Sequence, residues 1–153
     1  MRTALALLLL GTSLPGAALG QSAEILQPPL TLPETLRGTV RVPLAEPPSG
    51  IADTLPALFP ALAACWALPS GLDGLKDLQI TARFALRRDG TLIGTPRITF
   101  TAGTPDAAAR SSLVRATLTS IRRCTPARIT PALGRAIAGR PLALRLIDRG
   151  PER

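Results

Sequence analysis

The sequence of 153 residues contains no histidine and no tyrosine. Histidine is the usual general base for a serine or cysteine nucleophile, and it is also a common zinc ligand. The short motifs of α/β-hydrolases, P-loop proteins and dinucleotide-binding folds are missing as well. These absences disfavour an enzyme, so we expect no catalytic residue, no cofactor and no metal site.

Acidic residues are also scarce, with 10 against 18 lysines and arginines, which gives a net charge of +8. A positive protein suits acidic partners or an anionic surface. The basic residues are scattered, however, and no aromatic residues lie between them on which nucleic-acid bases could stack. We therefore expect no nucleic acid among the partners, and a basic solvated surface is the simpler interpretation of the charge.

No apolar run is long enough to span a bilayer; residues 4–10 form a short one. Arg2 precedes this run, and the small residues Ala18-Leu19-Gly20 follow it, as in a secretory signal peptide cleaved before Gln21. A buried N-terminal helix is the alternative, but glycines and a proline interrupt the segment. No cysteine follows the cleavage point, which argues against a lipid anchor. The sequence thus predicts export to the periplasm and a mature chain without a transmembrane segment.

The chain divides by composition into four parts. The signal peptide covers residues 1–20, and a proline-rich leader or linker covers residues 21–50, where proline restricts the backbone and removes amide donors. A folded domain follows over residues 51–149, and residues 150–153 form a tail. Within the leader, residues 39–42 fit a short additional edge strand.

Residues 78–101 alternate between apolar and polar side chains, as in a β-hairpin with one buried face. Glycine at position 90 can adopt the positive φ of a tight turn. A two-residue loop would place apolar residues opposite polar ones. The pattern therefore favours a three-residue loop, Arg88-Asp89-Gly90, with a bulge at the glycine. This register predicts three apolar pairs: Leu78 with Phe100, Ile80 with Ile98, and Leu86 with Leu92.

Apolar residues at helical spacing predict two main helices. The first begins after Asp53, its predicted N-cap, and extends to Trp66, which we expect in the core. Pro60 conflicts with a straight helix from residue 54, so the regular part can begin near Pro60 instead. The second follows Thr104 as its N-cap and ends before Pro126.

Residues 130–139 predict a short helix or turn, and residues 142–147 alternate as a last strand. The second helix returns the chain, so the last strand runs antiparallel to the first hairpin strand and pairs with it. The fold class is therefore α+β, in the order α-β-β-α-β. It is a three-stranded antiparallel sheet, ordered second-first-last, with two main helices on the face of Ile80, Phe84, Ile98 and Leu144.

The two cysteines, Cys65 and Cys124, stand at the ends of the two predicted main helices. Both helices should cover the same sheet face, and export would place the cysteines in an oxidising compartment. A disulfide is the favoured interpretation. A redox dithiol lacks the CxxC spacing, and a zinc site lacks further ligands.

Several short motifs stand in a characteristic order along residues 55–148. They are Cys65-Trp66 with Pro69, Arg88-Asp89-Gly90, Gly94-Thr95-Pro96, and Arg123-Cys124-Thr125-Pro126. Together they resemble the C-terminal domain of the TolA/TonB C-terminal-like proteins of Gram-negative bacteria, in the variant with a CW…P and RC.P cysteine pair. The resemblance implies a three-stranded antiparallel sheet with helices on one face. The chain departs from TolA and TonB in having a signal peptide and a short leader in place of a membrane anchor and a long spacer.

From this resemblance we expect a soluble periplasmic interaction module of the cell envelope, binding envelope proteins by strand addition at an exposed sheet edge. A free-standing structural or inhibitor-like periplasmic protein, unconnected to the Tol or Ton systems, is the alternative. For the arginines on the sheet face opposite the helices, two interpretations stay open. They orient the partner strand, or they only keep that uncovered face soluble. The predicted partner-binding residues are the arginines and the open edge of the last strand: Arg83, Arg97, Leu142, Ala143, Leu144, Arg145, Leu146 and Ile147.

Overall fold

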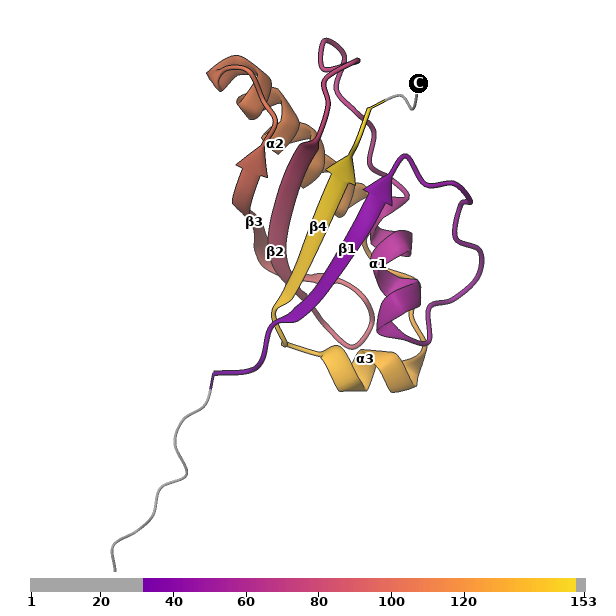
Figure 1. Cartoon of the computed structure of the whole chain (residues 1–153). Helices are drawn as coiled ribbons and strands as arrows, with labels where there is room; N and C mark the ends of the chain where they lie inside the picture. The colour runs from indigo at the N-terminus through magenta and orange to yellow at the C-terminus, as the bar shows by residue number, and fades with distance from the viewer. Residues whose placement is uncertain (1–31, 151–153) are drawn as a thin grey trace, which may run out of the picture. The chain divides into compact units, whose positions relative to one another are not determined.

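The computed structural model describes residues 32–150, which form one sheet with helices on one of its faces (Figure 1). The predicted signal peptide, the first part of the leader and the last three residues lie outside the described residues. In chain order the elements are β1 (Leu36–Val42), α1 (Leu55–Ala63), β2 (Leu78–Leu86), β3 (Leu92–Ala102), α2 (Ala107–Arg123), α3 (Pro131–Ile137) and β4 (Leu142–Asp148).

The sheet has four strands in the order β1-β4-β2-β3 and is mixed rather than antiparallel. The predicted order of the three later strands is confirmed, because β2 pairs antiparallel with both β3 and β4. The prediction of a three-stranded sheet is wrong by one strand: β1 pairs parallel with β4 along its whole length. The leader prolines obscured this strand, but Pro43 follows β1 directly and does not interrupt it.

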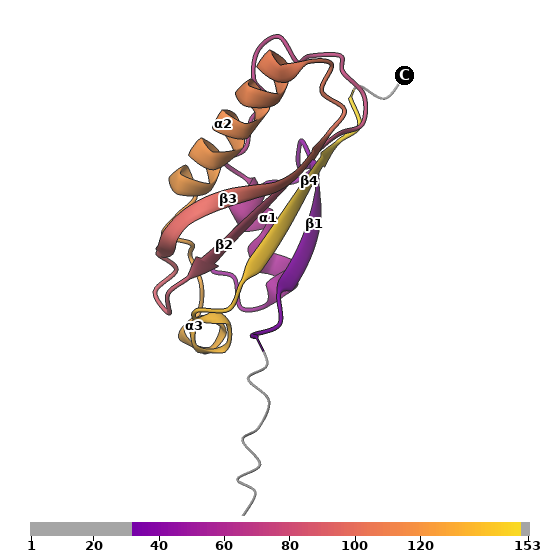
Figure 2. The ribbon, with the colours of Figure 1, turned by 90° about the vertical axis from the view of Figure 1, so that its left-hand side faces the viewer.

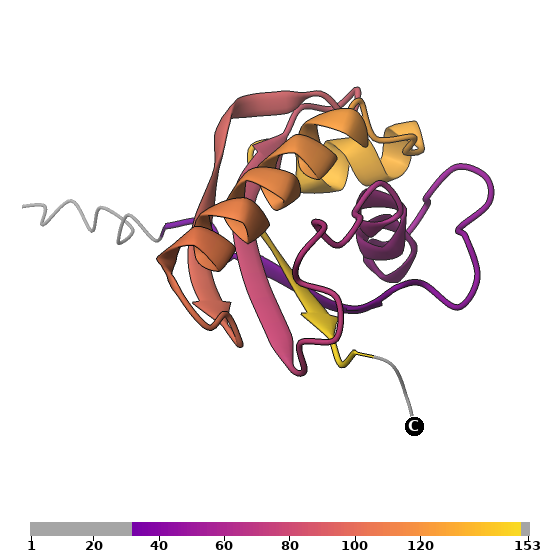
Figure 3. The same cartoon turned by 90° about the horizontal axis from the view of Figure 1, so that it is seen from above.

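Both main helices cover the same face of the sheet, as predicted (Figures 2 and 3). Helix α1 packs over β1, and α2 packs over β2 and β3. Their inward residues meet the even-numbered residues of β2 and β4 in one core. The most deeply buried large apolar side chains among them are Leu58, Leu62, Leu113, Ile121, Ile80, Leu86, Leu142, Leu144 and Leu146.

The helix ends differ from the prediction in detail. Helix α1 begins at Leu55 with Thr54 as its N-cap, and Pro60 lies inside it. Helix α2 is capped by Asp106 rather than Thr104, because the Asp106 carboxylate accepts a hydrogen bond of 2.7 Å from the Ala109 amide. Such a carboxylate satisfies one of the unpaired amides at a helix start.

The hairpin loop of three residues is confirmed. The Arg87 amide donates to the Thr91 carbonyl, and Gly90 has φ +83°. The predicted pair of Leu86 with Leu92 is confirmed too, but Ile80 lies opposite Thr101. Two irregularities shift the register between β2 and β3. From the pair Leu86–Leu92 to the pair Ile80–Thr101, β3 advances by nine residues while β2 advances by six. A bulge moves every later side chain relative to its neighbours.

These shifts move Phe100 to the other face of the sheet. It lies opposite Thr81, whose side chain points away from the helices, and its ring is 45% exposed. The predicted pairs of Ile80 with Ile98 and of Leu78 with Phe100 are therefore wrong. Ile98 lies opposite Ala82 and packs against the core.

The loop carboxylate of Asp89 accepts two hydrogen bonds from Thr91: one of 2.6 Å from the hydroxyl and one of 3.0 Å from the amide. The hydrogen bond from the Thr91 hydroxyl is the main reason why the pKa of Asp89 lies below its usual value, and the bond from the Thr91 amide is the second. Because the pKa of Asp89 is lower in the folded protein, these hydrogen bonds stabilise the fold at pH values above the Asp89 pKa of the unfolded chain. This stabilisation is lost as the pH falls through the Asp89 pKa of the folded protein.

We expect Thr91→Val to raise the Asp89 pKa, measured by carboxyl-carbon NMR titration. Thr95→Val, on exposed β3, should leave it unchanged.

Candidate partner-binding surface

The predicted partner-binding residues of β4 divide between the two faces of the sheet. Leu142, Leu144 and Leu146 point into the core and are at most 2% exposed. Ala143, Arg145 and Ile147 point to the face without helices. The three leucines are therefore structural, because a partner could not reach them in the folded protein.

The prediction of an open edge at residues 142–147 is wrong. Strand β4 is an inner strand, paired with β2 on one side and with β1 on the other. Its backbone amides are used in these ladders, which leaves none for an incoming strand. The difference arises because the fourth strand, β1, pairs with the side of β4 that was predicted to be unpaired.

The edges of the sheet are β1 and β3, and only β1 is regular. Strand β3 contains Pro96, two positions where its register shifts, and Gly94 with φ +66°. Proline and bulges hinder pairing at an edge. Strand β1 has neither, and it keeps one register over its seven residues. The open edge that can accept another strand is therefore β1.

The direction of the amides on β1 follows from its pairing with β4. The Leu36 amide donates to the Pro141 carbonyl at 2.8 Å, so even-numbered residues of β1 face β4. In a parallel ladder the amide and carbonyl of one residue point to the same neighbour, and they alternate along the strand. Arg37, Thr39 and Arg41 therefore present their backbone groups to the open edge.

A groove of about 580 Å³ runs along this edge, between β1 and α1. Its floor on the helix side is apolar, formed by Leu55, Pro56, Phe59 and Pro60. Phe59 packs directly on Gly38, where a Cβ atom would overlap the ring. The edge thus combines unpaired backbone groups with an apolar recess beside them. Neither the groove nor β1 was among the predicted site residues; the only signal was the alternation over residues 39–42.

The face of the sheet without helices, which is turned toward the viewer in Figure 1, carries several arginines. The predicted residues Arg83, Arg97 and Arg145 do lie on it, and the structure adds Arg37 and Arg41 from β1. We call these five residues the arginine face. Arg83 and Arg97 are direct cross-strand partners, and Ala143 and Arg37 continue the same row. Like charges directly opposite each other destabilise a sheet.

No acidic side chain balances the arginine face among residues 32–150. Asp148 is the only acidic residue in the four strands, and it is buried on the helix side. The one ion pair that the described part of the chain forms, Arg140 with Glu34 at 3.9 Å, lies outside the strands. Arg145 donates to the Gln79 side chain, and its guanidinium lies 5.5 Å from the Phe100 ring centre.

The structure separates the predicted site into two surfaces. Arg83 and Arg97 lie on β2 and β3, while the open edge is β1, with β4 between β1 and β2. Neighbouring strands are about 4.8 Å apart. A strand added at β1 would therefore lie next to Arg37 and Arg41, and β2 and β3, which carry Arg83 and Arg97, would be about 14 and 19 Å away.

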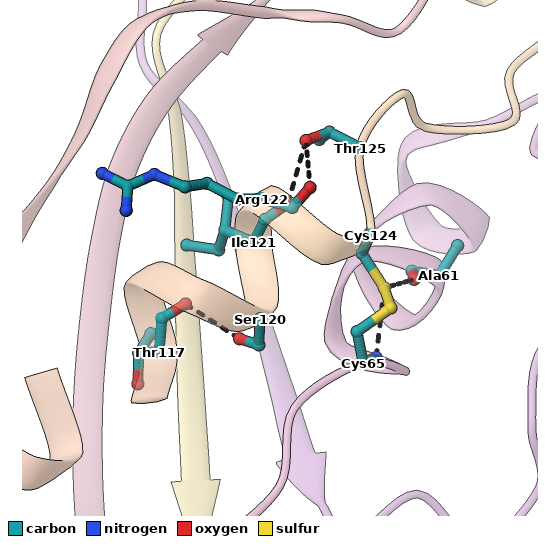
Figure 4. Close-up of a disulfide and its surroundings, with 8 residues drawn as sticks. All are labelled: Ala61, Cys65, Thr117, Ser120, Ile121, Arg122, Cys124 and Thr125. Atoms are coloured by element: carbon teal, nitrogen blue, oxygen red, sulfur yellow. Dashed lines mark hydrogen bonds between the residues drawn. A yellow bond between two sulfur atoms is a disulfide. The ribbon is translucent and has the colours of Figure 1, made fainter. Parts of the chain in front are cut away.

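Cys65 and Cys124 form the predicted disulfide, with their Cα atoms 5.6 Å apart (Figure 4). It joins the segment after α1 to the end of α2, and the Cys65 amide donates to the Cys124 sulfur at 3.1 Å. Next to it, the Trp66 indole donates to the Thr117 hydroxyl at 3.1 Å. Tryptophan thus anchors the two helices together. The disulfide is consistent with an extracytoplasmic location.

No helix within residues 32–150 is long and apolar enough to cross a membrane. In the same residues, no group of three histidine, cysteine or acidic side chains could hold a metal ion. A cavity of about 900 Å³ opens where β1 and β4 end and is lined by both basic and acidic residues, including Arg41, Arg149, Asp73 and Asp148.

Residues 49–150 match the family described as uncharacterised conserved protein UCP034077, and the chain belongs to this family. The match begins after β1 and covers all the later elements. Comparisons with the curated proteins and with the solved structures found no match. The comparisons show no link to the TolA/TonB proteins.

Proposed function

We propose that this protein is a periplasmic interaction module of the cell envelope that binds an extended segment of a partner protein by strand addition at β1. The observation that carries the proposal is the open, regular edge of β1 beside the apolar groove of α1. A binding role also agrees with a sequence that offers no histidine for catalysis.

The geometry favours a partner strand with alternating side chains. Backbone pairing with Arg37, Thr39 and Arg41 would supply affinity, as in other cases of strand addition. Partner side chains on the helix side would enter the groove at Phe59, so apolar residues suit them. Side chains on the other side would lie near Arg37 and Arg41, where acidic residues would speed association and set the register.

The resemblance of the cysteine and turn motifs to the TolA/TonB C-terminal domain supports the same class of function. In our proposal the chain shares with these domains the binding of a partner by strand addition. The partner is an envelope protein of the same compartment, and the signal peptide predicted over residues 1–20 delivers the chain there.

A proline at position 39 tests the proposal. Its ring would remove an amide that faces the open edge, so the ladder to β4 should survive while an added strand loses a hydrogen bond. We expect Thr39→Pro to abolish retention of the partner in a pull-down from periplasmic extract. Thr39→Val is the matched control, since it keeps the amide and should retain the same protein.

The two variants must also be folded, which thermal unfolding under non-reducing conditions would check. If Thr39→Pro and Thr39→Val retain the same proteins in equal amounts while both are folded, strand addition at β1 is wrong. A protein retained by the wild type and by Thr39→Val alone would be the partner to identify.

A further inference from the structure

We propose that the arginine face is a docking surface for the anionic headgroups of a phospholipid bilayer. This goes beyond strand addition, because β4 separates the β1 edge from β2 and β3, which carry Arg83 and Arg97. An added strand at β1 would leave these two arginines without a partner. Arg83 and Arg97 therefore need an anionic ligand other than the added strand.

The arrangement of the arginines favours a ligand that presents many negative charges in one layer. Arg37, Arg83 and Arg97 stand in one row across the sheet, with the small residue Ala143 between the first two. Arg145 lies in the next row on this face, and Arg41 lies in the row after that. A guanidinium binds phosphate through two parallel hydrogen bonds, and it is less strongly hydrated than a lysine. A bilayer can place a separate phosphate at every arginine, whereas one acidic strand follows a single line.

Apolar side chains among the arginines favour a lipid surface over a soluble acidic protein. Of the large apolar side chains exposed in residues 32–150, Phe100 and Ile93 belong to the sheet, at 45% and 40% exposure. Both lie on β3, and the guanidinium of Arg145 lies near the ring of Phe100. Aromatic and arginine side chains can enter the headgroup region, with their apolar parts toward the acyl chains.

A second basic surface in the same protein provides a control. The outward side of α2 carries Arg110, Arg115 and Arg122 around a shallow hollow with Val114 and Leu118. Arg110 also lines a hollow with Phe100, so the control uses Arg115 and Arg122, which have no exposed large apolar side chain beside them. General attraction of a protein with net charge +8 to an anionic membrane would use both basic surfaces, whereas a specific docking face would use one.

The test measures cosedimentation of the protein, purified from periplasmic extract, with vesicles of phosphatidylglycerol and phosphatidylcholine in equal parts. We expect binding that pure phosphatidylcholine vesicles do not support. Arg83→Gln/Arg97→Gln should weaken it about thirtyfold, from the usual contribution of a basic residue near an anionic bilayer. Arg115→Gln/Arg122→Gln loses the same charge and should change binding less than threefold. Glutamine on the exposed sheet face removes the opposed like charges, so the first variant should fold.

Other outcomes would overturn the proposal. Equal losses in the two double variants would show that net charge alone attracts the protein. Displacement by millimolar inorganic phosphate would indicate a site for a small anion, and displacement by polyglutamate at equal charge would indicate an acidic protein. High salt screens the charges, so the vesicle binding that remains there depends on apolar side chains. We expect Phe100→Ser to weaken this remaining binding. Unchanged binding of Phe100→Ser at high salt would contradict insertion of the apolar side chains.

Discussion

Replacing both Cys65 and Cys124 by serine is expected to lower the free energy of unfolding by about 4 kcal/mol. The disulfide closes a loop with a sequence separation of 59, and cross-linking a loop of that length restricts the unfolded chain by about this amount. A change of this size corresponds to a fall in Tm of about 15 °C for a domain of this length.

The measurement is chemical or thermal unfolding of the double variant beside the wild type with and without reductant. The reduced wild type should unfold like the variant, and reductant should not change the variant. A loss below about 1 kcal/mol would mean that the Trp66–Thr117 hydrogen bond and the buried helix faces hold α1 on α2 without the cross-link.

Gly38→Val is expected to destabilise the protein by about 3 kcal/mol, the upper part of the range for an overpacked core. Valine is favoured over glycine in strands, so local propensity predicts the opposite sign. The structure decides the sign, because the ring of Phe59 occupies the space that a Cβ atom at position 38 would need. Thr39→Val, one residue along the strand on the other face, should be nearly neutral.

A double-mutant cycle separates overpacking from a general defect of β1. Phe59→Leu makes room beside Gly38, so Gly38→Val should cost less in that background than in the wild type. If the cost is unchanged, the collision with Phe59 is not its cause. Since β1 is also the open edge of the sheet, we expect Gly38→Val to weaken partner retention together with stability.

The corrected position of the open edge changes where a partner can be sought. An edge at β4 would have placed a partner strand next to Arg145, with Arg83 one strand further away. With β1 at the edge, the partner strand of our proposal would lie beside α1, and the groove at Phe59 would select its side chains. In our proposals the two surfaces act together: the β1 edge would hold an extended segment of the partner, while the arginine face would lie against the bilayer.

The sequence by itself determined the features that depend on near neighbours in the chain. The three-residue loop at Gly90 follows from the conformational freedom of glycine and from the apolar alternation around it. The presence of α2 and of strand β4 follows from periodicity over one element. The disulfide could be predicted as well, because both cysteines end helices that cover one sheet face.

Only the tertiary structure decided the features that depend on distant contacts. The proline-rich surroundings of residues 36–42 gave a weak strand signal, yet these residues pair with β4 about one hundred residues later and bury Val40 and Val42. The irregular register of β3 is equally non-local, and it turned Phe100 to the outer face. A strand's edge position and a bulge's register arise from pairing and burial across the whole sheet, which periodicity within one segment does not record.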